Sequence, residues 1–225
     1  MILPRPGVAL GSAPMPWLAF ALLTSFLLIV FPLRSMIRRR RHGDAGRADW
    51  AARRPRAWLL ADLTFLSAFA LLIVGSALQG LDIVAPVVDV PDTAFGLAIV
   101  VIAGATALAI WSQETMGAAW RPDMPPAATA QLVTGGPFRV VRNPNYIAML
   151  AAGLSAVLLA ANLVSAVGWA ALLVSLMLTA RVEEPLLAER YGAPYRSYAA
   201  RVGRFVPGVG LLAWNRPATG GADLG

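Results

Sequence analysis

Residues 146–180 read YIAMLAAGLSAVLLAANLVSAVGWAALLVSLMLTA, which is two apolar runs joined at one polar residue, Asn162. About 20 apolar residues cross a bilayer as an α-helix, so each run is close to the required length. Backbone N–H and C=O groups in lipid must be satisfied within the protein, which favours helices over open strands. The stretch therefore predicts a tight transmembrane hairpin with spans at Tyr146–Ala161 and Leu163–Ala180.

The rest of the chain has the same apolar character. Of its 225 residues, 58% are hydrophobic and 14% are charged, whereas roughly a quarter of the residues in a soluble domain are charged. Mean hydropathy is +0.64. Three further windows qualify as spans, at Trp17–Leu33, Ala57–Gln79 and Thr93–Trp111. These features predict an all-α, polytopic integral membrane protein with about five transmembrane helices, a C-terminal helical hairpin and short cytoplasmic amphipathic helices.

The basic residues indicate how the spans are oriented. Of the 19 basic residues, all are arginine and all but Arg5 fall on one side of the five-span arrangement. Residues 34–56 hold nine of them, whereas the loop at 80–92 is acidic and has none. By the positive-inside rule the arginine-rich side is cytoplasmic. We therefore expect the N-terminus outside and the C-terminus inside.

Composition excludes several kinds of site. The chain has no cysteine, and its one histidine, His42, lies in an arginine run. Thiolate nucleophiles, disulfides and Cys- or His-based metal clusters are therefore excluded, and no metal is expected. A net charge of +7 could suggest a nucleic-acid partner, but the arginines flank apolar spans, so we expect none. Anionic lipid headgroups are the expected partner of the arginine-rich loop.

Two polar clusters flank the hairpin and form the candidate site. The first is the segment Gly135–Tyr146, with Arg139 and Arg142 as planar donors suited to a carboxylate or phosphate. The second contains Glu183 and Glu184, which on a helix point about 100° apart. We therefore expect one carboxylate to face a pocket while the other pairs with an arginine. Charges at span ends are costly unless paired, solvated or used, although interfacial anchoring is the simpler alternative.

Several connecting segments carry weaker signals. Asp44–Arg56 combines arginine with Trp50 and is typical of an interfacial segment. Residues 121–134 are rich in proline and alanine, which indicates a loop or re-entrant lid. The amphipathic stretch 181–201 predicts one or two short cytoplasmic helices, broken at Gly192-Ala193-Pro194. We expect residues 1–16 to be loose and 216–225 to be disordered.

The order of these motifs resembles the isoprenylcysteine carboxyl methyltransferase and phospholipid methyltransferase superfamily. The resemblance covers about residues 116–207. It rests on the run 132–146, the hairpin, Arg181-x-Glu183-Glu184, Tyr191-Gly192-x-x-Tyr195-x-x-Tyr198 and Arg201-Val202-x-Arg204-Phe205-Val206-Pro207. It implies S-adenosyl-L-methionine as the methyl donor, bound near the cytoplasmic face by the segments that flank the last two spans.

The resemblance also implies site residues. We expect Arg142 and Glu184 to be catalytic. We expect the cofactor to be bound by Gly136, Pro137, Phe138, Arg139, Arg142, Asn143, Pro144, Tyr146, Glu183 and Glu184. Two positions depart from the superfamily pattern: Asn143 replaces the usual histidine, and Ala148 replaces a common glycine. The asparagine amide cannot accept a proton as a base, so a mechanism that uses imidazole as the base is ruled out here.

These expectations define an organisation and a leading function. Residues 1–112 form a variable region of three spans, residues 113–210 a methyltransferase-like region, and residues 211–225 a tail. The leading hypothesis is an S-adenosylmethionine-dependent methyltransferase, in a bacterial inner membrane, that modifies a lipophilic carboxylate, thiol or amine reaching it from the bilayer. The alternative is a non-catalytic, lipid-binding scaffold that keeps the fold. A transporter is less favoured because no internal repeat is evident.

Overall fold

The computed structural model describes residues 14–43, 56–120 and 131–212. Four expectations from the sequence therefore lie wholly or largely outside the described residues. They concern the N-terminal segment, the interfacial segment at 44–56, the Pro-rich loop at 121–134 and the tail beyond residue 212.

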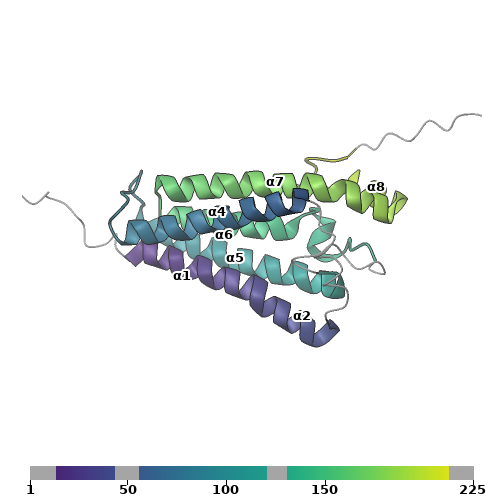
Figure 1. Cartoon of the computed structure of the whole chain (residues 1–225), viewed down its shortest axis with the longest axis horizontal. Coiled ribbons are helices and arrows are strands. Elements are labelled where there is room, and N and C mark those ends of the chain that lie inside the picture. The colour runs from purple at the N-terminus through teal and green to yellow at the C-terminus, as the bar shows by residue number, and fades with distance from the viewer. Residues whose placement is uncertain (1–13, 44–55, 121–130, 213–225) are drawn as a thin grey trace, which may run out of the picture.

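The described chain is a bundle of long helices that run along one common direction (Figure 1). The elements are α1 (Pro14–Leu28), a π-helical turn η1 (Ile29–Leu33), α2 (Arg34–His42), α4 (Arg56–Gly80), α5 (Asp92–Met116), the 3₁₀ turns η2 (Gly117–Ala119) and η3 (Gly136–Arg139), α6 (Pro144–Leu159), α7 (Leu163–Tyr191) and α8 (Ala193–Ala199). Within the described ranges no strand forms, so the all-α prediction is confirmed.

The predicted spans are present as helices. Four helical stretches are long and apolar enough to cross a membrane: Pro14–Arg41, Leu59–Gly80, Thr93–Ala119 and Leu163–Tyr191. The shorter apolar helix α6 has 16 residues and is about 24 Å long. It begins with Pro144, whose missing N–H costs nothing at the first helical position. The protein is a polytopic membrane protein, as predicted.

Two helices extend beyond the boundaries that hydropathy suggests. The first span does not end in a loop at residue 34, because it continues through η1 into α2 as far as His42. Likewise α7 runs on past Ala180, through Pro185, to Tyr191 instead of giving way to a separate short helix. Hydropathy marks where the apolar environment ends, whereas a helix continues in water while its hydrogen-bond ladder is intact. The predicted break at Gly192 is confirmed, with φ of 60° at that residue.

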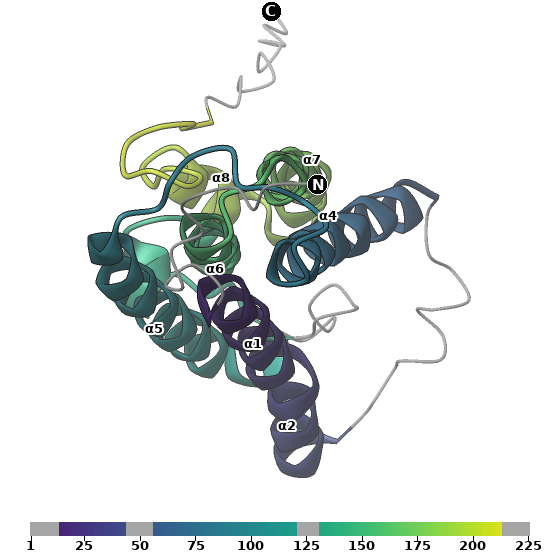
Figure 2. The ribbon, with the colours of Figure 1, turned by 90° about the vertical axis from the view of Figure 1, so that its left-hand side faces the viewer.

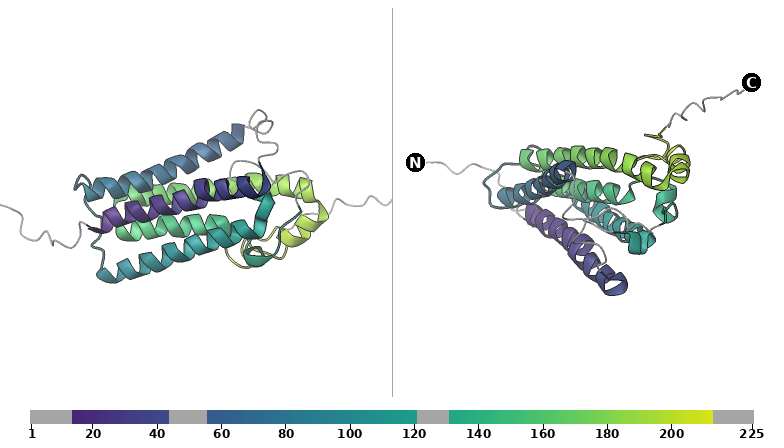
Figure 3. Two further views of the ribbon diagram at one scale, coloured as in Figure 1. Left: turned by 90° about the horizontal axis from the view of Figure 1, so that it is seen from below. Right: turned by 45° about the vertical axis from the view of Figure 1, so that its right-hand side comes forward.

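The helices pack most closely at the end of the bundle that holds the hairpin turn. Viewed along the bundle, α4 lies against α7 and α5 against α6 (Figure 2). A Cβ added to Gly168 would lie 2.9 Å from the backbone nitrogen of Leu72, and one added to Gly75 would lie 2.6 Å from Ser165 Oγ. Glycine at both positions therefore permits the close crossing of α4 and α7. Toward the other end the helices spread apart (Figure 3).

Asn162 locks the hairpin turn to α4. Its side chain is 1% exposed. Nδ2 donates to the carbonyl oxygen of Gly75 at 3.0 Å and to Gln79 Oε1 at 2.9 Å, while Oδ1 accepts from the Ser165 backbone N–H at 2.9 Å and caps α7. The one polar residue between the two apolar runs thus fixes both the turn and its neighbour.

We expect Asn162→Ala to lower the free energy of unfolding by about 2–3 kcal/mol, because it removes a helix cap and two buried hydrogen bonds. Thermal unfolding of the detergent-purified protein measures this. Asn162→Ser is the matched control, since serine also caps helix N-termini but lacks the amide donors. Its melting temperature should fall between those of wild type and Asn162→Ala. A melting temperature unchanged by the alanine would contradict the role given to Asn162.

The opposite end of the bundle collects the arginines. We call it the basic end. It holds α2 with Arg34 and Arg38–Arg41, the segment before α6 with Arg139 and Arg142, and the end of α7 with the segment that follows it. Since α6 begins and α7 ends there, the two polar clusters of the sequence meet at this end.

Candidate active site

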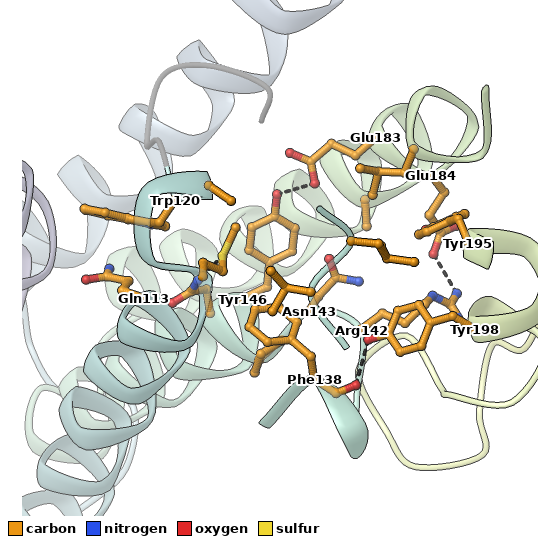
Figure 4. A pocket seen from close by; sticks show the side chains of 18 of the residues that line it. Gln113, Trp120, Phe138, Arg142, Asn143, Tyr146, Glu183, Glu184, Tyr195 and Tyr198 are labelled. Atoms are coloured by element: carbon orange, nitrogen blue, oxygen red, sulfur yellow. Dashed lines mark hydrogen bonds and ion pairs between the residues drawn. The ribbon is translucent and has the colours of Figure 1, made fainter. Parts of the chain in front are cut away.

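A cavity of about 250 Å³ lies at the basic end. Its wall brings together residues from η1, α5, α6, α7, α8 and the connecting segments. Figure 4 shows Gln113 and Trp120 on one side, Arg142, Tyr195 and Tyr198 on the other, and Tyr146 and Asn143 between them. The full lining is Phe31, Gln113, Met116, Ala119, Trp120, Gln131, Leu132, Val133, Phe138, Arg142, Asn143, Pro144, Asn145, Tyr146, Met149, Ala180, Glu183, Glu184, Leu186, Leu187, Tyr191, Tyr195 and Tyr198.

The segment before α6 is shaped by its glycine and prolines. Gly136 has φ of 54°, and a Cβ there would lie 2.7 Å from Thr115 Oγ1, so both conformation and space require glycine. Pro137 then opens the 3₁₀ turn, and Phe138 is buried against the cavity. The same turn directs Arg139 outward, where it is exposed.

Val141 pairs with Gly203 as an isolated parallel bridge, which brings the later segment beside the start of α6. The Arg142 N–H donates to the Gly203 carbonyl at 2.8 Å, and the Asn143 N–H to that of Arg204 at 3.1 Å. A Cβ on Gly203 would lie 2.0 Å from the Val206 carbonyl oxygen, so this position also requires glycine. The residues after α8 therefore form a wall of the site.

Arg142 and Glu184 form a buried ion pair, with side chains 3% and 6% exposed and an N–O distance of 2.6 Å. Arg142 also donates to three carbonyl oxygens, those of Ala199 at 3.0 Å, Val202, and Gly210 at 2.8 Å. The guanidinium therefore joins α7 to the residues that follow α8. Its Nε is buried and has no hydrogen-bond partner.

Arg204 holds the other side of the Glu184 carboxylate. Its Nε donates to Oε1 at 2.9 Å and its terminal nitrogen to Oε2 at 2.5 Å. The hydrogen bonds to Glu184 raise the pKa of Arg204 above its ordinary value. Glu184 is thus the carboxylate that pairs with arginine, and it is paired with two arginines.

Glu183 also lines the cavity, but it differs from Glu184 in its partner. Its Oε2 accepts a hydrogen bond of 2.7 Å from the Tyr146 hydroxyl (Figure 4). Among the residues that the structure describes, no arginine is within ion-pair distance of Glu183. The expectation that one of the two glutamates pairs with an arginine is therefore confirmed for Glu184. Both carboxylates line the cavity, and Glu183 does so without a basic partner among the described residues.

The two asparagines before Tyr146 differ in their surroundings. Asn143 Nδ2 donates to the Arg204 carbonyl oxygen at 3.3 Å, which places this side chain against the wall. Asn145 Oδ1 is buried and has no partner in the structure. Both residues line the cavity, so Asn145 offers an unused hydrogen-bond acceptor there.

Helix α8 closes the site through its tyrosines. The Tyr198 hydroxyl donates to the Phe138 carbonyl at 2.7 Å, and Tyr195 and Tyr198 pack edge to face. Burial raises the pKa of the Tyr198 hydroxyl to about 12 and also raises that of Tyr195. Both hydroxyls therefore stay protonated at neutral pH, and that of Tyr198 acts as a hydrogen-bond donor.

Gln113 connects the cavity to the first span. Its Nε2 donates to the Val30 carbonyl at 3.1 Å, and its Oε1 accepts from Arg34 Nε at 3.0 Å. Val30 lies in the π-helical turn that contains Pro32, where the regular hydrogen-bond ladder is interrupted. Gln113 therefore satisfies a carbonyl of this turn and helps to place Phe31 in the cavity wall.

The structure brings together most of the residues that the sequence singles out. Phe138, Arg142, Asn143, Pro144, Tyr146, Glu183 and Glu184 line the cavity, whereas Gly136, Pro137 and Arg139 do not. Sequence reasoning did not select Phe31, Gln113, Asn145 or Tyr195. Tyr195 could have been predicted from the regular spacing of the tyrosines after residue 190. The other three depend on contacts between segments that are distant in sequence.

Comparison with known families adds one finding. Residues 93–194 match the model of the phospholipid methyltransferase family. This part of the chain, which we call the methyltransferase-family region, is similar to that family. The methyltransferase-family region contains α5, α6 and α7 and therefore both polar clusters, but not α1, α2 or the segment after α8. A search of curated proteins found no match.

The similarity of this region to a methyltransferase family agrees with the superfamily that the sequence resembles. It also indicates a membrane methyltransferase activity, since the same region contributes three of the apolar helices. The cavity wall extends beyond the family region, because Phe31 and Tyr195 lie outside residues 93–194.

Proposed function

We propose that the protein is an integral membrane methyltransferase that transfers a methyl group from S-adenosyl-L-methionine to a lipophilic acceptor. The observation that carries the proposal is the cavity at the basic end of the methyltransferase-family region, where the Glu183 carboxylate faces the interior without a basic partner in the described chain. The acceptor class is a carboxylate, thiol or amine.

The wall fits the chemistry of this donor, which carries a sulfonium cation, an ammonium, a carboxylate and ribose hydroxyls. Glu183 suits a cation, and the rings of Trp120, Phe138 and Tyr146 suit the sulfonium and the adenine. Asn145 Oδ1 is an unsatisfied buried acceptor for an N–H or O–H group. Among the described residues of the wall, Arg142 is the one arginine. Its Nε has no hydrogen-bond partner within the protein and could therefore donate to the carboxylate of the methyl donor.

The residues of the cavity would act by positioning and by excluding water. When bound, the donor supplies an electrophilic methyl group. Trp120 and Phe138 are buried in the wall, and α8 contributes a further part of the wall, held to Phe138 by Tyr198. In-line displacement depends on alignment and dryness more than on proton transfer. The Tyr146 hydroxyl holds one oxygen of Glu183, which leaves the other oxygen for a cationic group.

Apolar side chains on the wall suit a lipid-soluble acceptor. Phe31 from η1, Met149 from α6 and Leu187 from α7 lie in the same lining as the polar groups. An acceptor with an apolar tail would reach these residues from the bilayer, while the polar donor would come from the water phase. We propose that this water phase is the cytoplasm, because the arginines gather at this end, and that the membrane is a bacterial inner membrane.

The proposal predicts that S-adenosylhomocysteine binds the purified protein and raises its thermal stability. A ligand at 100 times its dissociation constant stabilises the folded state by about 2.7 kcal/mol. Calorimetry and thermal unfolding measure this, and incubation of membranes with methyl-labelled donor identifies the acceptor from the labelled lipid fraction.

Failure of both binding and labelling in folded protein would overturn the proposal. Binding without methyl transfer, across lipid extracts that contain carboxylates, thiols and amines, would favour the non-catalytic scaffold. The control is S-adenosylhomocysteine added to heat-unfolded protein, which should show no binding.

A further inference from the structure

One face of α2 carries arginine at regular helical spacing. Arg34, Arg38 and Arg41 are separated by four and three residues, so they lie above one another on the same side of the helix. Arg39 and Arg40 lie on other sides and are exposed. A general topology signal does not require arginines on one face. We call the side of α2 formed by Arg34, Arg38 and Arg41 the arginine face, to distinguish it from the other arginines of the basic run.

The arginine face turns toward α5. Arg34 donates to Gln113 Oε1 at 3.0 Å and pairs with Glu114 Oε1 at 2.5 Å. Arg41 reaches the other oxygen of Glu114 at 3.3 Å. These contacts fix Arg34, whose side chain is 12% exposed, in a definite position, while the Arg41 side chain remains 60% exposed.

A small hollow lies within this arrangement. Its volume is about 20 Å³, and its wall includes all three arginines of the face, Glu114, Gln113 and Trp120. Roughly 10–15 Å³ on this measure holds one water-sized group, so the hollow admits a single oxygen atom. The wall has three guanidinium groups and one carboxylate, and its net charge is positive.

The hollow adjoins the main cavity, since Gln113 and Trp120 line both. It also lies at the depth of lipid headgroups. The helical stretch from Pro14 is continuous through α2, and Arg34 lies about 30 Å along it, which equals the thickness of the hydrocarbon core. Arg38 and Arg41 follow about 6 and 10 Å further on, in the headgroup region.

We propose that the arginine face of α2 is a binding site for the phosphate of an anionic phospholipid, with one phosphate oxygen in the hollow beside Trp120. Phosphate oxygens are the partners that guanidinium groups prefer. The arginines of the site lie on α2, outside the methyltransferase-family region, whereas the other side of the hollow is formed by residues 113–120 within it. The proposal that this site binds lipid does not depend on the proposed function. Any link between the site and methyl transfer rests on the proposed function.

The first test is retention of phosphatidylglycerol by protein purified in neutral detergent, measured by native mass spectrometry. The Arg38→Gln/Arg41→Gln variant should bind phosphatidylglycerol at least about tenfold more weakly than wild type, since each arginine near an anionic headgroup contributes about fivefold. The Arg39→Gln/Arg40→Gln variant has the same net charge and should bind like wild type. Equal retention by all three proteins, or equal loss in both variants, would overturn the site.

The second test decides whether the phosphate belongs to the acceptor or to a separate lipid. Methyl transfer is followed in nanodiscs of phosphatidylcholine, with and without phosphatidylglycerol. If the acceptor carries the phosphate, Arg38→Gln/Arg41→Gln raises KM for the acceptor in both nanodiscs and leaves kcat and S-adenosylhomocysteine affinity unchanged. If the lipid is separate, phosphatidylglycerol stimulates wild type and not this variant.

Absence of methyl transfer in every protein would count against the proposed function alone, because retention of phosphatidylglycerol then still decides the site. Phosphatidylglycerol retention that depends on Arg38 and Arg41 would support the lipid site. Retention that is unchanged in Arg38→Gln/Arg41→Gln would overturn the site, whatever the enzyme assay shows.

Discussion

Arg142→Met is expected to lower the free energy of unfolding by about 3–5 kcal/mol, because removing one partner of a buried ion pair leaves uncompensated polar groups. Here the loss affects Glu184 and three carbonyl oxygens, those of Ala199, Val202 and Gly210. Thermal unfolding of the detergent-purified protein measures the stability, and limited proteolysis reports release of the segment after α8. Loss of S-adenosylhomocysteine binding should follow, since that segment forms a wall of the site.

Arg139→Met is the matched control. It removes the same charge three residues earlier, at an exposed position outside the cavity lining, and should change stability by less than about 0.5 kcal/mol. A double-mutant cycle with Glu184→Gln isolates the pair. If Arg142→Met melts like Arg139→Met and yet fails to bind S-adenosylhomocysteine, Arg142 acts on the ligand directly, as a catalytic or cofactor-binding residue, and the architectural role described above is wrong.

Glu183→Gln is expected to weaken donor binding by about 10- to 150-fold while leaving stability nearly unchanged. Hydrogen bonds to charged groups contribute about 1.5–3 kcal/mol, which is this range in affinity. Glutamine has the same shape and can still accept from the Tyr146 hydroxyl, so only the negative charge is lost. Calorimetric titration with S-adenosylhomocysteine measures the affinity.

Two comparisons sharpen this prediction. Tyr146→Phe keeps the charge of Glu183 and removes only its hydrogen bond, so its effect on affinity should be the smaller one. Glu189→Gln is a charge-matched control on the same helix, outside the cavity lining, and should bind like wild type. Unchanged affinity in Glu183→Gln would show that its carboxylate does not meet the donor.

The meeting of the two polar clusters could be predicted from sequence because it follows from the hairpin. Adjacent antiparallel spans must return to the same side of the bilayer, so the residues before α6 and those in the second half of α7 lie at one end. The 100° rotation between neighbours on a helix likewise predicts that Glu183 and Glu184 have different partners. Both inferences need only local geometry and the membrane.

Which glutamate pairs with arginine could not be predicted, because the answer depends on residues far along the chain. Glu184 is fixed by Arg204 and by Arg142, and Arg142 is directed inward by the pairing of Val141 with Gly203. The same pairing explains why Arg139 and Arg142, equally basic in sequence, differ in burial. The extent of α2 was missed for another reason: arginines end an apolar run without ending a helix.

The unbroken course of α7 has a consequence for how the protein responds to its bilayer. From Leu163, beside the Asn162 lock, to Glu184 the helix is about 30 Å long and has no proline before Pro185. A straight helix accommodates a thinner hydrocarbon layer by tilting. If α7 tilts about the hairpin turn, Glu183 and Glu184 move together, and their displacement is large because they lie at the far end of the helix. In a thinner bilayer we therefore expect the two carboxylates to move as one unit with the end of α7.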